Sequence, residues 1–418
     1  MTKKKLWQFP WGYPEAALFV AAITLVGFLL QLTIGHFNFA LLSYPANLIA
    51  LTVLIGLIAL FVRFQNNLFV RWIAGIPMAI ALTVALLLLG FYMELTPQLP
   101  RLPPSTSDLV SRLGFRMVTS SWPFVLVFCM TLLALGITTL KRLLRFSRQD
   151  ITFLCNHLGL WILLASSGFG AADMVRVVMH INTGETEWRV FNKDGEHLEL
   201  PIAITLNKFT MEEYPPSLTI IDRKAEQRPD AKPKAKKDFF QIDPKRPEGR
   251  IDNWAIRVDE YLHTAVRIGG EFRNSPMPES TPAAKVTARN LSTGETKTGW
   301  VSSGGSILEF FSPLPLDDHY SVVMALPEPK RFASDITVIP KNGTPFNAIL
   351  EVNKPISVGH WMIYQYGYNT ALGKMSHWSE IELVYDPWLL PAQIGMGLMV
   401  IGALLLAWNG ASRRRNLQ

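Results

Sequence analysis

Six long apolar runs constrain the fold of this chain more than any other feature of its sequence. None contains Asp, Glu, Lys or Arg, and each approaches the roughly 20 residues that a helix needs to cross the hydrocarbon of a bilayer. Each run therefore predicts a membrane-spanning α-helix. The runs are residues 16–34, 46–62, 72–92, 122–140, 151–172 and 388–408, of which 46–62 is the shortest.

The composition agrees with a membrane protein. Apolar residues make up 49% of the chain and charged residues only 17%, whereas soluble domains average roughly 25% charged residues. The first run is longer than the apolar core of a signal peptide, which spans about 7–15 residues, and no small-residue cleavage site follows it. We therefore expect this run to be retained as a helix.

The distribution of Lys and Arg among the short connecting segments predicts the orientation. If the N-terminus is cytoplasmic, the segments on that side hold twelve basic residues, against three in the loop at 93–121. Basic residues concentrate on the cytoplasmic side of membrane proteins. Residues 173–386 are then expected on the extracytoplasmic side. Because the basic excess is largely this orientation signal, the net charge of +7 indicates no nucleic-acid partner.

Three parts follow from this topology: a five-helix region at 1–172, an extracytoplasmic domain at 173–386, and a sixth helix with a basic tail at 387–418. Within 173–386 apolar and polar residues alternate, which is typical of half-buried strands. The clearest alternating sets are Ile202, Ile204 and Leu206, then Trp254, Ile256 and Val258, then Ile381, Leu383 and Tyr385.

Turn signals separate these strands, and they read "NKDG" at 192–195, "STGE" at 292–295 and "KNGTP" at 341–345. Short strands without intervening helices predict an antiparallel β domain, either a sandwich or an open barrel. One stretch, residues 223–250, is rich in Lys and Pro and poor in apolar residues. We expect it to be a flexible insertion between strands.

No common catalytic signature occurs in the chain. HExxH, GxSxG, GxxxxGK[ST], CxxC and CxxCH are all absent, and the histidines beyond residue 173 lack metal-ligand spacing. The two cysteines, Cys129 and Cys155, both fall in predicted helices, so the outer domain can form no internal disulfide. These absences argue against an enzyme that acts alone.

Asn156 and His157 stand inside the fifth apolar run. Ionisable residues within spans are costly and usually face a bundle interior, a pathway or a ligand. At a rise of about 1.5 Å per residue, His157 lies roughly 10 Å along the helix from Asp150. A neutral imidazole there can ligate haem iron, or it can hydrogen-bond a neighbouring helix. The residues by themselves leave both interpretations open.

A resemblance to a known family is carried by four segments in fixed order. They are "FLCNHLGLWILLASSGFGAADMVRVVMHINTGE" at 153–185, "LPIAITLNKFTMEEYP" at 200–215, "LEVNKPISVGHWMIYQYGYN" at 350–369 and "SEIELVYDPWLLPAQIGMGLMVIGALLLAW" at 379–408. This ordered set resembles the ResB/CcsB family of System II cytochrome c biogenesis. The resemblance extends from about residue 150 to the C-terminus.

The resemblance implies a function in the bacterial inner membrane. Such proteins work with a CcsA-like partner to move haem b outward and present it to apocytochrome c. The partner's tryptophan-rich haem motif is absent here, so the partner is expected to be a separate protein. The implied complex has holocytochrome c synthase activity, and the implied partners also include membrane lipid and a thiol-disulfide reductant of the CcsX/ResA type.

One residue receives a role from this resemblance. His157 occupies the position of a transmembrane axial ligand to haem iron in fused relatives. Apart from the resemblance, Arg176 lies just outside the same helix and is a weaker candidate for contact with a haem propionate, because a basic residue at that place is more often an interfacial anchor. Two other interpretations remain open: a membrane-anchored sensor or binding protein with a ligand-binding outer domain, and a structural scaffold without haem in which His157 only packs.

Overall fold

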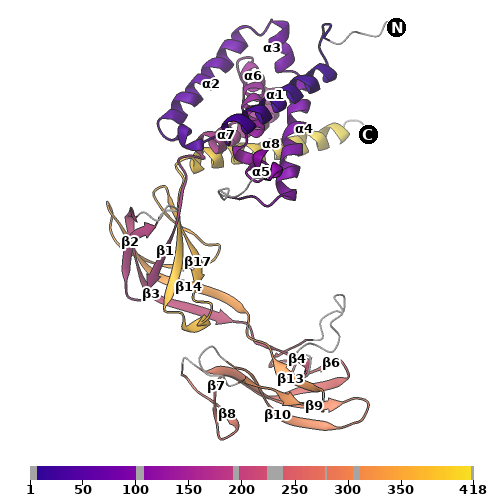
Figure 1. Cartoon of the computed structure of the whole chain (residues 1–418), viewed down its shortest axis with the longest axis vertical. Helices are drawn as coiled ribbons and strands as arrows, with labels where there is room; N and C mark the ends of the chain where they lie inside the picture. The colour runs from indigo at the N-terminus through magenta and orange to yellow at the C-terminus, as the bar shows by residue number, and fades with distance from the viewer. Residues whose placement is uncertain are drawn as a thin grey trace. The chain divides into compact units, whose positions relative to one another are not determined.

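The computed structural model describes residues 7–99, 108–191, 197–223, 239–277, 280–304 and 311–415. It divides the chain into two units, one comprising residues 1–174 and 385–418 and the other residues 175–384. The first is helical and the second is built mainly from β-strands (Figure 1). In chain order, the strand unit is thus inserted before the last long helix of the helical unit.

Six of the described helices are long and apolar enough to cross a membrane, as the sequence predicts. Within the helical unit, the described residues also form short helical turns between some of these helices. The long helices are α1 (Tyr13–Ile34), α2 (Ala46–Arg63), α4 (Ile76–Leu95), α6 (Trp122–Leu143), α7 (Ile151–Gly170) and α8 (Leu389–Arg415). The short ones are η1 (Phe39–Leu42), α3 (Leu68–Ile73), α5 (Leu109–Arg112), η2 (Val118–Ser120) and η3 (Arg148–Asp150).

The predicted span at 72–92 begins differently in the structure. Trp72 belongs to the short helix α3, and α4 starts at Ile76 with Gly75 as its N-cap and a proline in its first turn. A proline lacks the N–H that a helix interior needs, but it fits the first turn, where that N–H has no partner anyway. The uniform apolar composition of this run therefore conceals a break in the helix.

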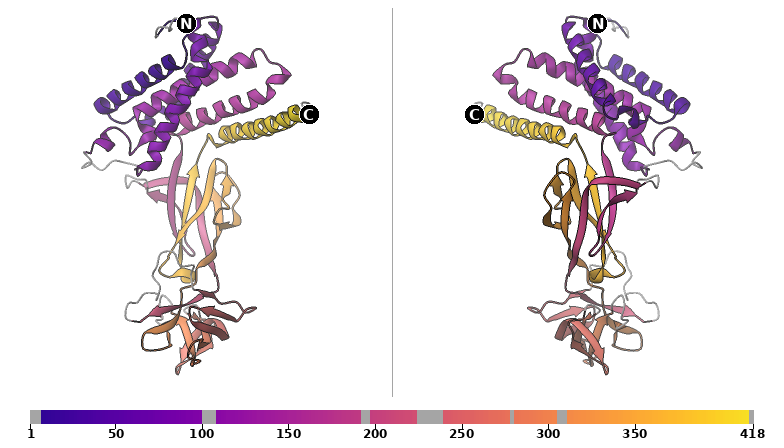
Figure 2. Two further views of the ribbon diagram at one scale, coloured as in Figure 1. Left: turned by 90° about the vertical axis from the view of Figure 1, so that its right-hand side faces the viewer. Right: turned by 90° about the vertical axis from the view of Figure 1, so that its left-hand side faces the viewer.

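The helical unit is organised around α6, which packs against α1, α2, α4 and α7. Helix α8 packs along α7 (Figure 2). Close packing relies on small residues: a Cβ added at Gly27 of α1 would lie 2.5 Å from Pro123 Cα of α6. Between 11% and 39% of each candidate span is buried inside the protein, as expected for helices whose outer faces meet lipid.

The strand unit contains four open antiparallel sheets, and the described strands close no barrel. This outcome confirms the predicted antiparallel β class. The first sheet has the order β1 (Val175–Asn182), β18 (Trp378–Tyr385), β17 (Trp361–Tyr368), β16 (Ile356–Val358), and the second the order β15 (Phe346–Glu351), β14 (Pro329–Pro340), β3 (His197–Glu213), β2 (Thr186–Phe191).

The other two sheets are made from the middle of the chain. One has the order β12 (Leu314–Pro315), β13 (Tyr320–Met324), β4 (Ser217–Asp222), β5 (Phe240–Gln241). The other has the order β11 (Phe311–Ser312), β10 (Thr296–Ser303), β9 (Thr281–Asn290), β7 (Trp254–Ile268), β6 (Glu248–Ile251), and β8 (Glu271–Asn274) pairs with β7.

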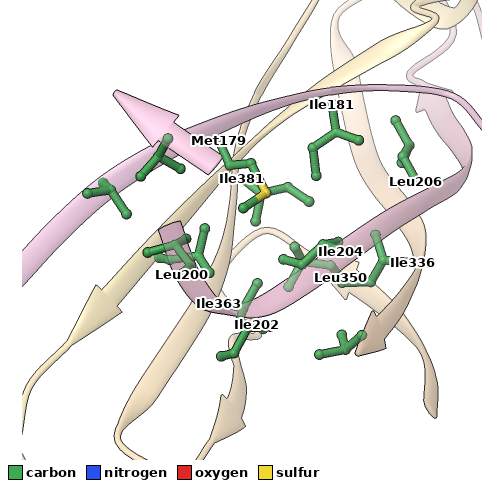
Figure 3. Close-up of a cluster of buried hydrophobic side chains, with 14 residues drawn as sticks. Met179, Ile181, Leu200, Ile202, Ile204, Leu206, Ile336, Leu350, Ile363 and Ile381 are labelled. Carbon is green, nitrogen blue, oxygen red and sulfur yellow. The ribbon is translucent and has the colours of Figure 1, made fainter. Parts of the chain in front are cut away.

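Two main hydrophobic cores hold the strand unit together. In the first, side chains from β1, β3, β14, β15, β17 and β18 point toward one another (Figure 3). It contains the predicted inward residues Ile202, Ile204 and Leu206, and also Ile381 and Leu383. The second core contains Trp254 and Ile256, with Val258 packed against it. The alternating pattern in the sequence therefore predicted the buried faces correctly.

Two of the three predicted turns fall where the chain reverses. Residues 292–295 lie between β9 and β10, and residues 341–345 lie between β14 and β15. The turn expected at 192–195 lies outside the described residues. So does 224–238, the greater part of the expected insertion at 223–250. The described remainder of that stretch includes β5 and most of β6, so it takes part in two of the sheets.

Candidate functional site

Helix α7 is held in a fixed rotation between α6 and α8. The indole Nε1 of Trp161 donates a hydrogen bond to the backbone oxygen of Leu132 on α6, at 3.0 Å. On the α8 side, a Cβ added at Gly159 would lie 2.6 Å from the backbone oxygen of Gly395. Because both contacts involve backbone atoms, they determine which way every other side chain of α7 points.

Asn156 belongs to the interface between α7 and α8. Its Nδ2 donates to the backbone oxygen of Thr152, one turn earlier, at 2.9 Å. A Cβ added at Gly402 of α8 would lie only 2.6 Å from that Nδ2 atom. The glycine therefore makes room for the amide, whose polar group is satisfied within α7.

His157 is held by its own helix in one tautomer. Its Nδ1 lies 3.0 Å from the backbone oxygen of Phe153. A carbonyl oxygen can only accept, so Nδ1 carries the proton and donates it, which leaves a lone pair on Nε2. The imidazole also stacks on the Phe153 ring, with centroids 3.7 Å apart and planes 18° from parallel. Among the described residues, none forms a hydrogen bond with Nε2.

This arrangement fits an axial ligand of haem iron. Metal-binding histidines usually donate their second ring N–H to a carbonyl or carboxylate, which fixes the tautomer and the ring orientation. Phe153 supplies both the carbonyl and a stacking surface for the ring. The half-buried imidazole thus presents a basic nitrogen from an apolar helix.

Arg142, near the end of α6, lies next to this histidine's stacking partner. Its guanidinium carbon is 4.4 Å from the centroid of the Phe153 ring. Its Nη1 forms a short ion pair with Asp150, the residue that precedes α7. The side chain remains 51% exposed. A positive charge is therefore held beside the phenyl ring on which His157 stacks.

Arg176, the second predicted site residue, lies in β1 of the strand unit. Its Nε is 3.5 Å from a carboxylate oxygen of Glu382 on β18, and its side chain is 61% exposed. The positive charge of Arg176 thus already has a partner on the neighbouring strand.

The histidines beyond residue 173 form no metal centre among the described residues, where no group of three or more His, Cys, Asp or Glu side chains could hold an ion. His180, for instance, packs its ring against Trp378, with centroids 4.4 Å apart.

A polar junction at the other end of α7 was not predicted from the sequence. Asp173 accepts hydrogen bonds from the Tyr44 backbone N–H at 2.8 Å, from Asn47 Nδ2 at 2.6 Å and from Trp388 Nε1 at 2.8 Å. Asn47 Nδ2 also donates to the backbone oxygen of Phe169, at 3.0 Å. One carboxylate thus ties together the ends of α2, α7 and α8. Asn47, a polar residue inside an apolar run, was the sequence feature that could have indicated this junction.

The helical unit also has apolar grooves. One of about 650 Å³ lies between α1 and α4, with Ala17, Ala21, Ala81 and Ala85 among the residues that line it. A second, of about 540 Å³, is lined by residues of α1, α2 and α6. Neither groove is lined by His157 or Arg142, so both are separate from the histidine site.

Comparison with known proteins connects one part of the chain to a family. The model of the ResB-like family matches residues 318–385. These residues run from just before β13 to the end of β18. No curated protein matches the chain. The resemblance expected from the sequence is confirmed within residues 318–385, a range that does not include His157, Arg142 or Arg176.

Proposed function

We propose that this chain is a ResB-type subunit of cytochrome c biogenesis and that His157 is an axial ligand of haem b inside the membrane. The ResB-like match over residues 318–385 supports the role in cytochrome c biogenesis. The observation that carries the ligand assignment is the hydrogen bond from His157 Nδ1 to the Phe153 carbonyl, since it leaves Nε2 free to coordinate iron.

The two units would divide the work. The helical unit would hold haem through His157 and dock a CcsA-like membrane protein, which supplies the haem-presenting motif that this chain lacks. The strand unit, on the extracytoplasmic side of a bacterial inner membrane, would position apocytochrome c or the presented haem edge. A thiol-disulfide reductant would keep the apocytochrome cysteines reduced, because the strand unit has no cysteine of its own.

The test is a haem spectrum of the chain purified with its CcsA-like partner. His157→Ala should lose most of the bound haem, and added imidazole should restore it by replacing the missing ligand. His157→Met should retain some haem but raise its reduction potential, because a thioether ligand favours the reduced iron. An unchanged haem content and spectrum in both variants would remove His157 from the proposal.

His180→Ala is the matched control. This histidine also packs against an aromatic ring, but it lies on the exposed face of β1. Its loss should leave the haem content and spectrum unchanged. If His180→Ala reduced the haem content as much as His157→Ala does, the effect could not be assigned to ligation within α7.

A further inference from the structure

We infer that Arg142 binds a carboxylate group of the ligand that His157 holds. This inference rests on the proposed function, because it takes His157 as the iron ligand. Two contacts connect Arg142 to His157. The guanidinium carbon of Arg142 lies 4.4 Å from the centroid of the Phe153 ring, and that ring stacks on the imidazole of His157 with centroids 3.7 Å apart. A cation and the imidazole therefore both contact the same phenyl ring.

The ligand that suits this arrangement is amphipathic and anionic. An apolar macrocycle can lie against the apolar surface of α7 only if its charged groups reach the end of the bundle. Arg142 is placed at that end, one residue before the end of α6, and Asp150 marks the start of α7. Haem, with a flat apolar ring and two carboxylates at one edge, meets both requirements.

Arg142 has donors left for such a group. A guanidinium carries five N–H donors in a planar fork, and the ion pair with Asp150 engages one of its terminal nitrogens. The side chain is half-exposed, so an incoming carboxylate can reach it. In addition, residues 141–150 contain four basic residues and one acidic residue. The local charge therefore stays positive after Asp150 is paired.

Arg142 is a better candidate for this contact than Arg176. Among the described residues, Arg142 is the one cation found over a ring of α7. The guanidinium of Arg176 instead pairs with Glu382 within the strand unit. The neighbouring Arg145 shares the basic turn and has a similar charge, which makes it the matched control for a general electrostatic effect.

The experiment compares two probes on the purified full chain: haemin, and haemin dimethyl ester, in which both carboxylates are capped. Arg142→Gln should weaken haemin binding by about tenfold, as expected for the loss of one partly exposed charge-assisted hydrogen bond. It should leave binding of the ester unchanged. Arg142→Lys should recover part of the affinity for haemin, and Arg145→Gln should change the affinity for neither probe.

Two outcomes would overturn the inference. If Arg142→Gln weakened haemin and the ester equally, Arg142 would act by supporting α7 and not by binding a carboxylate. If Arg145→Gln weakened haemin as much as Arg142→Gln, the basic turn would attract the ligand without a specific contact.

His157→Ala separates this inference from the proposed function. Loss of the imidazole should weaken the binding of both probes, because both contain iron. If His157→Ala bound both probes normally while Arg142→Gln still discriminated between them, the iron-ligand assignment would be wrong and the carboxylate contact would remain.

Discussion

Asp173 shows how much one side chain can determine in this protein. Its carboxylate receives three hydrogen bonds, from a backbone N–H before α2, from the fully buried Asn47 of α2 and from the indole of Trp388 before α8. Burial alone would raise the pKa of this carboxyl. The three donors outweigh that effect and hold the pKa of Asp173 below its usual value.

Asp173→Asn should therefore destabilise the helical unit. An amide has one acceptor oxygen where the carboxylate has two, and its NH₂ group would face a donor. The expected loss is about 1–3 kcal/mol in the free energy of unfolding at neutral pH. Unfolding in detergent, monitored by tryptophan fluorescence, measures this loss. As the control, Glu94→Gln replaces an exposed acid near the end of α4 and should change the free energy of unfolding little. Equal losses in both variants would contradict the role given to Asp173.

The same substitution predicts a pH dependence. Because the pKa of Asp173 is lowered in the folded protein, its stabilising effect is fully present above the unfolded-state pKa, about 4. The effect is lost as the pH falls through the lower, folded-state pKa. The difference in unfolding free energy between the native chain and Asp173→Asn should thus shrink below about pH 4. A difference that stayed constant from pH 7 to pH 3 would argue against an ionised carboxylate.

At the scale of elements, the pairing of α7 with α8 requires glycine at position 395 of α8 but not at position 397. A Cβ added at Gly395 would lie 2.7 Å from the backbone oxygen of Gly159 and 2.8 Å from the backbone nitrogen of Leu163. Neither backbone atom can move without shifting α7. At Gly397, by contrast, nothing lies within 4 Å of an added Cβ.

Gly395→Ala should push the two helices apart, whereas Gly397→Ala should be tolerated. Overpacking of this kind typically costs about 1–3 kcal/mol, while a surface change usually stays within about 0.5 kcal/mol. Thermal unfolding in detergent gives the comparison. Because α8 also fixes the rotation of α7, Gly395→Ala should lower haem affinity as well. Equal midpoints for the two variants would show that α7 and α8 do not pack through this glycine.

The elements themselves were largely predictable from sequence, because their signals are local. Apolar length gave the six spans, and alternation gave inward faces such as Ile202 and Ile204. The break at Gly75 was missed because an apolar run reads the same with or without a proline in a first turn. His157 was identified as a candidate ligand, but its tautomer required the geometry of the Phe153 carbonyl.

The junction at Asp173 and the position of Arg142 could not be predicted in the same way. Asp173 contacts residues 126 and 215 positions away in the chain, and no periodic pattern reports such contacts. Arg142 was counted as an orientation signal, because a basic residue at the end of a span has that meaning in a sequence. Only the packing of α6 against α7 places its guanidinium over Phe153.

At the scale of the whole molecule, the two units carry different kinds of information about function. The ResB-like match lies at residues 318–385, almost entirely in the strand unit. The candidate ligand His157 and its neighbour Arg142 lie in the helical unit. The proposed function needs both units, since haem held in the bundle has to meet an apocytochrome on the side of the strand unit. The proposed function therefore depends on the orientation of the chain in the membrane.

Cysteine labelling tests that premise. In a background in which Cys129 and Cys155 are replaced by Ser, Thr293→Cys places a thiol in the exposed turn between β9 and β10, and Ser147→Cys places one in the exposed α6–α7 turn. The excess of basic residues predicts that the second turn lies in the cytoplasm. A membrane-impermeant maleimide should then label Thr293→Cys in intact spheroplasts and label Ser147→Cys only after lysis. The reverse pattern would put the strand unit in the cytoplasm, away from any apocytochrome that is matured outside it.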